Sequence, residues 1–184
     1  MRNIKVILLG GEPASGKTTV FKCVRDVLFP APKRFKHKTA CGVVDGRFIM
    51  LGVFDGSTFE GTDKLSMSVI NDALELLEML DAQPERRVVF VEGDRLFCRR
   101  FINSTSAEVY ILQTDCEILR NRRECRKKQG ISQPEAFYIS RRSKIQSIAN
   151  LYGLSFSANN TLSDSAQIAS RLIASGERWV NGQD

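Results

Sequence analysis

Apolar residues along the chain fall into short unbroken runs that alternate with longer helical repeats. An unbroken run rich in β-branched residues predicts a strand buried on both faces, whereas apolar residues every three or four positions predict an amphipathic helix. The runs predict strands over residues 4–9, 39–44, 47–54, 87–91, 109–112 and 153–157. The repeats predict helices over residues 20–28, 64–80, 137–149 and 164–174, and a strongly basic helix that ends at Gly130. This alternation predicts an α/β fold, a mostly parallel sheet with helices on both faces.

One pair of predicted strands interrupts the alternation. Residues 39–44 and 47–54 are separated only by Asp45 and Gly46, and an Asp-Gly pair between apolar runs is a strong signal for a β-hairpin. A doubly wound sheet does not need this hairpin. We therefore interpret it as an insertion that faces the substrate.

Composition is typical of one soluble globular domain spanning residues 1–184, with 42% hydrophobic and 26% charged residues. The 27 Lys and Arg against 21 Asp and Glu give a net charge of +6, which permits a polyanionic partner but does not require one. The apolar run Val6–Leu9 is too short for a signal peptide or a membrane span. We expect a cytoplasmic protein.

Cysteine and histidine usage argues against several classes of site. The five cysteines are an odd number without metal-ligand spacing, and His37 is the only histidine. A disulfide framework and a zinc site are therefore not expected. His37 lies in a basic run with no nucleophile motif nearby, which argues against a Ser/His/Asp or Cys/His hydrolase. We interpret His37 as a solvated loop side chain.

A glycine-rich segment between the first predicted strand and the first helix carries the most specific motif. Gly11, Gly16, Lys17 and Thr18 fill every fixed position of G-x-x-x-x-G-K-[ST]. The glycines let backbone amides face a phosphate, Lys17 reaches the β and γ oxygens, and Thr18 is a Mg²⁺ ligand. Further candidates to contact the nucleotide are Ala14, Ser15 and Thr19. We expect ATP with Mg²⁺; the alternatives are a chance glycine turn or a loop that holds phosphate without turnover.

Acidic residues follow two of the predicted strands, where an open α/β sheet binds its ligands. Asp55 ends the 47–54 run and is our candidate to accept the proton of an attacking hydroxyl, with an Asx turn as the alternative. Asp63 is a second candidate, or the N-cap of the 64–80 helix. Glu92 and Asp94 follow the 87–91 strand as a Walker-B pattern and are candidate metal ligands. Arg95 either pairs with one of these acids or contacts a substrate phosphate.

The basic helix before Gly130 follows Thr114 and Asp115, which we expect to cap it. Its cations cannot share one face, because successive helical residues are 100° apart. Two pairs are one turn apart, Arg122 with Arg126 and Arg123 with Lys127. One pair is expected to face bound phosphates and stabilise the transferring group. The alternative is a solvated basic helix, which accounts for at least half of these side chains.

Taken in order, Gly11–Thr18, Glu92–Arg95, the segment Arg120–Arg126 and Ala158–Asn160 resemble the P-loop kinases of the nucleoside and nucleotide kinase group. The resemblance implies a single-domain P-loop kinase fold with a mobile lid over about residues 117–145. It implies that the lid carries Arg120, Arg123 and Arg126, with Arg123 and Arg126 catalytic and Arg120 on the nucleotide. It also implies that Asn159 and Asn160 lie near the base. The chain departs from the nucleoside monophosphate kinases, because it has no clear acceptor-phosphate clamp between the first helix and the third strand.

The segments Phe54–Gly56 and Gly61–Ser66 also resemble bacteriophage kinases that phosphorylate 5-hydroxymethyluracil within DNA. This resemblance implies a DNA substrate and, for a phage protein, the host cytoplasm. Phe35 is then a candidate to stack on an extruded base, or it packs against the core. The alternatives are a small-molecule nucleoside or nucleotide kinase and a P-loop ATPase or switch. Candidate DNA contacts are Lys33, Arg34, Lys36, Lys38, Arg99, Arg100, Arg141 and Arg142.

Overall fold

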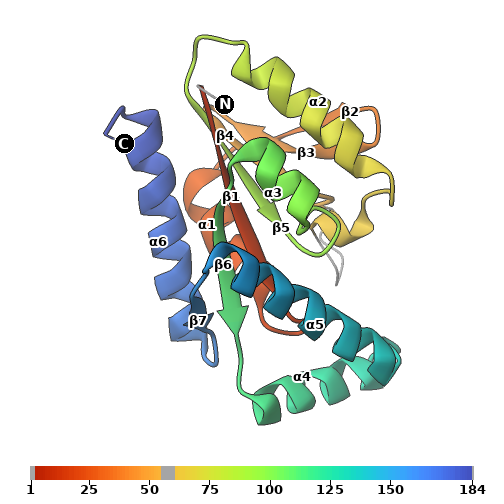
Figure 1. Cartoon of the computed structure of the whole chain (residues 1–184). Helices are drawn as coiled ribbons and strands as arrows, with labels where there is room; N and C mark the ends of the chain where they lie inside the picture. Colours follow the sequence, from red (N-terminus) through yellow and green to blue (C-terminus); the bar gives the residue numbers. More distant parts are fainter. Residues whose placement is uncertain (1–2, 55–60, 184) are drawn as a thin grey trace.

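Seven strands form one sheet in the order β2-β3-β4-β5-β1-β6-β7 in the computed structural model, which describes residues 3–54 and 61–183 (Figure 1). The strands β4, β5, β1, β6 and β7 run parallel to one another, and β2 and β3 extend the sheet in antiparallel pairing. The prediction of a mostly parallel α/β sheet is confirmed. The strands are β1 (Ile4–Gly11), β2 (Lys33–His37), β3 (Ala40–Asp45), β4 (Phe48–Leu51), β5 (Arg87–Glu92), β6 (Glu108–Gln113) and β7 (Phe156–Ala158).

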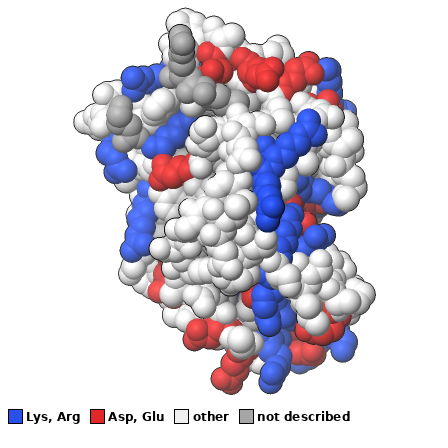
Figure 2. Space-filling view, in the orientation of Figure 1, with Lys and Arg blue, Asp and Glu red and all other residues white. Residues whose placement is uncertain are grey.

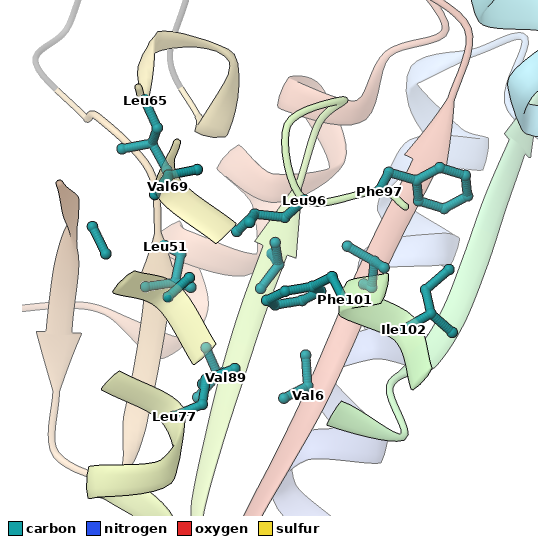
Figure 3. Close-up of a cluster of buried hydrophobic side chains, with 14 of the residues drawn as sticks. Val6, Leu51, Leu65, Val69, Leu77, Val89, Leu96, Phe97, Phe101 and Ile102 are labelled. Carbon is teal, nitrogen blue, oxygen red and sulfur yellow. The ribbon is translucent and has the colours of Figure 1, made fainter. Parts of the chain in front are cut away.

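Helices pack on both faces of the sheet, as the unbroken apolar strands require. One face carries α1 (Lys17–Leu28) and α6 (Leu162–Val180), which contact each other. The other carries α2 (Val69–Asp81), α3 (Arg99–Thr105) and the C-terminal half of α5 (Glu135–Tyr152). Figure 3 shows Val6 and Val89 of the sheet beneath Leu77 of α2 and Phe101 of α3. The helix α4 (Cys116–Lys128) and the start of α5 extend past the carboxyl ends of β1 and β6 (Figure 1).

The predicted hairpin is confirmed, with Asp45 paired to Phe48 across its turn. The strand β4 ends at Leu51 rather than residue 54. Gly52 has a φ of 137°, and a side chain there would meet the backbone of Gly61 at 2.6 Å. The chain leaves the hydrogen-bonded sheet at this close approach, so the apolar run of the sequence continues beyond the end of the strand.

The interpretation of His37 as a loop side chain is wrong, because Lys33–His37 forms the edge strand β2. An edge strand exposes alternate side chains to solvent, and lysines there discourage pairing with other chains. Phe35 faces inward and packs against the core beside Gly42. His37 Nε2 lies 3.4 Å from Glu75 Oε1, so His37 is not a solvated loop residue.

Two helix boundaries also differ from the sequence predictions. The helix predicted over 64–80 begins at Val69, and Thr62–Lys64 forms a separate 3₁₀ turn named η1. Asp63 therefore caps no α-helix. Asp115 occupies the N-cap position of α4 but makes no side-chain capping bond. The short helix α3 was not predicted, because its seven residues carry too few apolar positions to show a helical repeat. Within residues 3–54 and 61–183, no helix has the length and apolar character to cross a membrane.

Candidate active site

A cavity of about 360 Å³ opens where the carboxyl ends of β1 and β5 meet η1, α4 and α5. Five cations and three acids line it, so its surface is strongly polar and carries excess positive charge. The charged residues are Lys17, Lys64, Arg95, Arg126, Arg141, Asp63, Glu92 and Asp94. The other lining residues are Gly11, Pro13, Ala14, Gly16, Thr18, Ile131, Gln133, Phe137 and Tyr138.

The glycine-rich segment forms the floor of this cavity, between β1 and α1. Gly16 is the N-cap of α1 with a φ of 93°, and a side chain there would meet Asn159 Nδ2 at 2.5 Å. Only glycine fits this position. Lys17 Nζ donates to the carbonyls of Gly11 at 2.9 Å and Glu12 at 3.1 Å. The unpaired backbone amides at the start of α1 present the positive end of the helix dipole to an anion. The first turn of α1 contains no acidic residue that would repel an anion there.

Thr18 and Glu92 form an oxygen-rich pair beside Lys17. Glu92 is 3% exposed, and Thr18 Oγ1 donates to its Oε1 at 3.5 Å. Burial raises the pKa of Glu92 to about 7, against the opposing charge of Lys17. A buried carboxylate next to a hydroxyl suits Mg²⁺, because a cation offsets the cost of ionising the acid. Residues 3–54 and 61–183 contain no group of three metal-ligating acids, histidines or cysteines, so such an ion would take its other ligands from phosphate oxygens and water.

Asp94, the second candidate metal ligand, is engaged by α5 instead. Its carboxylate lies 3.1 Å from Arg141 Nη2 and 2.9 Å from Lys144 Nζ. Arg141 in turn lies over the ring of Phe137, with 4.8 Å between the guanidinium carbon and the ring centroid. Asp94 therefore ties the loop after β5 to α5, and Glu92 alone of the two acids lies beside Thr18.

Asp63, in η1, lines the same cavity as the glycine-rich segment. Its Oδ1 accepts a hydrogen bond from the Asp94 amide at 2.8 Å, and Thr62 Oγ1 donates to the Glu92 carbonyl. A side chain at Gly93, where φ is 102°, would meet Thr62 Oγ1 at 2.6 Å. This close fit holds Asp63 against the end of β5. Asp55, the other candidate proton acceptor, lies outside the described residues.

The side chains of the four arginines of α4 lie in four different environments. Arg126 lines the cavity, where burial lowers its pKa. Arg122 Nη1 donates to the Ala14 carbonyl at 3.3 Å. Arg123 Nη2 lies 2.9 Å from Glu12 Oε2, and Arg120 is exposed. Of the three arginines predicted for the lid, only Arg126 lines the cavity, because residues three positions apart on a helix share a face only approximately.

Glu12 fastens both α4 and α5 to the glycine-rich segment. One oxygen pairs with Arg123, and the other lies 3.0 Å from Arg142 Nε. The guanidinium carbon of Arg123 also lies 4.1 Å from the ring centroid of Tyr138. Sequence reasoning missed Glu12 and Tyr138, because Glu12 occupies a variable position of the motif and Tyr138 carries no local signal.

Figure 2 shows Lys and Arg side chains gathered in a band over α3, α5 and α4.

Asn159, predicted to lie near the base, makes hydrogen bonds within the protein through its side-chain amide. The residue is fully buried, its Nδ2 donates to the Ser15 carbonyl at 2.6 Å, and its Oδ1 accepts from Ser165 Oγ at 2.7 Å. Both ends of the amide are therefore satisfied within the protein. Asn160 Oδ1 accepts from the Asp115 amide at 3.0 Å. Thr19 lies in the first turn of α1 and does not line the cavity.

Most of the candidate DNA contacts are engaged within the protein. Arg34 donates to the Phe54 carbonyl at 3.2 Å, and Lys38 pairs with Glu75. Arg141 and Arg142 pair with Asp94 and Glu12, as described above. Arg99 donates to Ser147 and Arg100 to Asn71. Lys33 and Lys36 are exposed on β2, which β3, β4 and β5 separate from β1.

The chain is similar to a P-loop kinase family model and to two solved structures. The family model described as P-loop Nucleotide Kinase3 matches residues 2–164. No curated protein matches the chain. Among solved structures, a gluconokinase from Sinorhizobium meliloti 1021 is 12% identical with a TM-score of 0.46, and the alignment covers 100% of each chain. A de novo designed PLOOP2X3_50 fold protein is 11% identical with a TM-score of 0.43, covering 100% of this chain and 98% of its own. Because the family model spans most of the sequence, the chain belongs to the P-loop Nucleotide Kinase3 family.

Proposed function

We propose that the chain is an ATP- and Mg²⁺-dependent kinase that transfers the γ-phosphoryl group to a hydroxyl of a small acceptor. The observation that carries this proposal is that Lys17, Asp63 and Arg126, from three separate elements, line one cavity of about 360 Å³. Phosphoryl transfer needs a cation on the donor phosphates, a group that orients the attacking hydroxyl and a charge that stabilises the transferring group. These three residues supply one of each.

Each group has a defined part in the proposed reaction. Lys17 and the amides at the start of α1 hold the triphosphate, and Thr18 and Glu92 hold Mg²⁺, which neutralises charge on the phosphate oxygens. The acceptor oxygen forms a bond to the γ-phosphorus as the bond from that phosphorus to the ADP oxygen breaks. Asp63 accepts the hydroxyl proton, and Arg126 stabilises the charge on the transferring group.

The cavity favours a small acceptor over a base in DNA. Side chains of α4 and α5, among them Arg126, Phe137 and Tyr138, line it together with Asp63, Lys64 and Arg95, and its volume is about 360 Å³. DNA binding requires exposed cations in a continuous path, and three of the eight candidates, Lys38, Arg141 and Arg142, already form ion pairs within the protein.

A modified base in DNA, such as 5-hydroxymethyluracil, is the second candidate acceptor. Lys33 and Lys36 favour it, because both are exposed on the edge strand β2 and a net charge of +6 attracts a polyanion. In this case the target base would leave the duplex to reach the cavity, which β3, β4 and β5 separate from β2.

One experiment separates these acceptors. The protein is incubated with γ-labelled ATP and Mg²⁺ together with free nucleosides, nucleotides, unmodified DNA or DNA containing 5-hydroxymethyluracil. We expect label on a free nucleoside or nucleotide, with little dependence on salt. Label on the modified DNA, falling steeply as salt rises, would establish the second candidate. Release of inorganic phosphate with every acceptor left unlabelled would contradict both and identify an ATPase.

A further inference from the structure

Ala14 is held in a backbone conformation that only glycine adopts without cost. Its φ is 73°, in the left-handed region where the β-carbon of other residues crowds the backbone. Ala14 is 4% exposed and lies two residues before Gly16. A conformation of this kind persists only where surrounding contacts determine it.

Donors from three other segments hold the peptide groups of Ala14 and Ser15. Asn159 Nδ2 donates to the Ser15 carbonyl at 2.6 Å, and Thr114 Oγ1 lies between that oxygen, at 3.3 Å, and the Asn159 carbonyl, at 3.0 Å. Arg122 Nη1 donates to the Ala14 carbonyl at 3.3 Å. A trans peptide points its N–H opposite its carbonyl. Turning the Ser15 carbonyl toward β6 and β7 therefore turns the N–H of Gly16 the other way, and Gly16 lines the cavity.

Arg122 differs from the other two donors in the element that carries it. Thr114 and Asn159 directly follow β6 and β7, so they are fixed to the sheet. Arg122 belongs to α4, which extends past the sheet. Its guanidinium also donates to the carbonyls of Asn159 at 3.4 Å and Asn160 at 3.0 Å. The forked guanidinium thus joins the glycine-rich segment to the loop after β7. A lysine cannot reproduce this arrangement, because its ammonium group is a single point charge without the planar fork of donors.

We propose that Arg122 is a positioning residue that keeps Ala14 in its left-handed conformation and so couples the placement of α4 to the triphosphate affinity of the glycine-rich segment. Arg122 acts through the backbone in this proposal, because its guanidinium donates to three backbone carbonyls, those of Ala14, Asn159 and Asn160. The inference rests on the proposed binding of a triphosphate there.

The test measures the dissociation constant of AMP-PNP with Mg²⁺ by isothermal titration calorimetry. Arg122→Ala is expected to raise it about tenfold, and Arg122→Lys to recover only part of the loss. Lys128→Ala, at an exposed position of α4, serves as the matched control and should change it less than about twofold. Equal dissociation constants for the Arg122→Ala and Lys128→Ala proteins would overturn the proposal.

A second substitution tests whether Arg122 acts through Ala14. Glycine adopts a φ of 73° without steric cost, so Ala14→Gly should restore most of the affinity in the Arg122→Ala protein and have a smaller effect in the wild-type protein. The same fold-change in both backgrounds would show that the two residues are independent. Within the Arg122→Ala background the measurement stays valid if that change lowers stability, since the single and the double variant both carry it.

Kinetics separate positioning from a direct role. With ATP varied at a saturating concentration of the acceptor identified in the panel, Arg122→Ala should raise KM for ATP about as much as the dissociation constant and leave kcat within about threefold of the wild-type value. A large fall in kcat alone would place Arg122 on the transferring group and overturn the inference. Failure of the wild-type protein to bind AMP-PNP would contradict the proposed function instead.

Discussion

The Oε1 atom of Glu92, at the end of β5, lies 3.5 Å from the Oγ1 atom of Thr18, in the first turn of α1. The two residues are 74 positions apart in the sequence. They meet because β5 pairs with β1 in parallel, with Leu9 opposite Glu92, so that β5 ends where the glycine-rich segment begins. This register brings a buried acid to the first turn of α1, where the proposed metal site lies.

Glu92 should make the stability of the metal-free protein fall as pH rises from about 4.5 to about 7. Burial raises its pKa from 4.5 to about 7, so the folded state keeps a proton that the unfolded chain has released in this range. Raising the pH therefore favours unfolding, by at most roughly 3 kcal/mol. Glu92→Gln should remove this part of the pH dependence, measured by urea unfolding in EDTA. Glu124→Gln, at an exposed position, is the control, and an unchanged slope in Glu92→Gln would contradict the assignment.

Lys17→Ala should lower phosphoryl transfer by about a hundredfold or more, because the β and γ oxygens lose their cation. The measurement is transfer of label from γ-labelled ATP to the acceptor identified in the panel. Lys22→Ala, on the exposed side of α1, should leave the rate unchanged. Transfer at the wild-type rate by the Lys17→Ala protein would show that the triphosphate does not bind at this segment.

Asp63→Asn should lower kcat by about a hundredfold to ten-thousandfold and leave the affinity for AMP-PNP nearly intact. Asparagine keeps the oxygen that accepts the Asp94 amide, so the loop geometry is retained while the proton acceptor is lost. Equal losses in affinity and kcat would make Asp63 a structural residue.

Asp55→Asn is the companion variant, because Asp55 is the other candidate from the sequence. If Asp63 accepts the proton, kcat of the Asp55→Asn protein should remain close to the wild-type value. Loss of transfer in Asp55→Asn, with Asp63→Asn active, would assign the proton to Asp55.

Arg126→Ala should reduce kcat by about a thousandfold with a smaller change in KM, because Arg126 is the α4 arginine that lines the cavity. Arg123→Ala should reduce kcat much less, since Arg123 pairs with Glu12. Single-turnover transfer with both variants, and with Lys127→Ala at a neighbouring exposed position, measures the difference. A larger loss in Arg123→Ala than in Arg126→Ala would reverse the assignment.

Glu12→Gln should loosen α4 and α5 from the rest of the protein, because the neutral amide cannot pair with Arg123 and Arg142. The expected result is faster hydrogen exchange over residues 116–152, with β1 and β5 unchanged. Glu124→Gln, an exposed position on α4, is the control. Identical exchange in the Glu12→Gln and wild-type proteins would mean that other contacts hold the two helices.

The sequence by itself determined the layered fold and the glycine-rich segment. Both depend on local properties: unbroken apolar runs require cover on two faces, and Gly16 adopts a backbone conformation that a side chain would prevent. The hairpin turn at Asp45 and Gly46 is local in the same way. The family match over residues 2–164 agrees with these predictions.

Only the tertiary structure decided which polar side chains share the cavity. From the sequence, Glu92 and Asp94 were equivalent candidate metal ligands. In the structure they differ, because Asp94 forms ion pairs with Arg141 and Lys144 of α5. The arginines of α4 also looked equivalent, and their destinations depend on how α4 packs against Glu12, Ala14 and the loop after β7. These contacts join residues about 40 to 110 positions apart in the chain, so they follow from packing and carry no local signal.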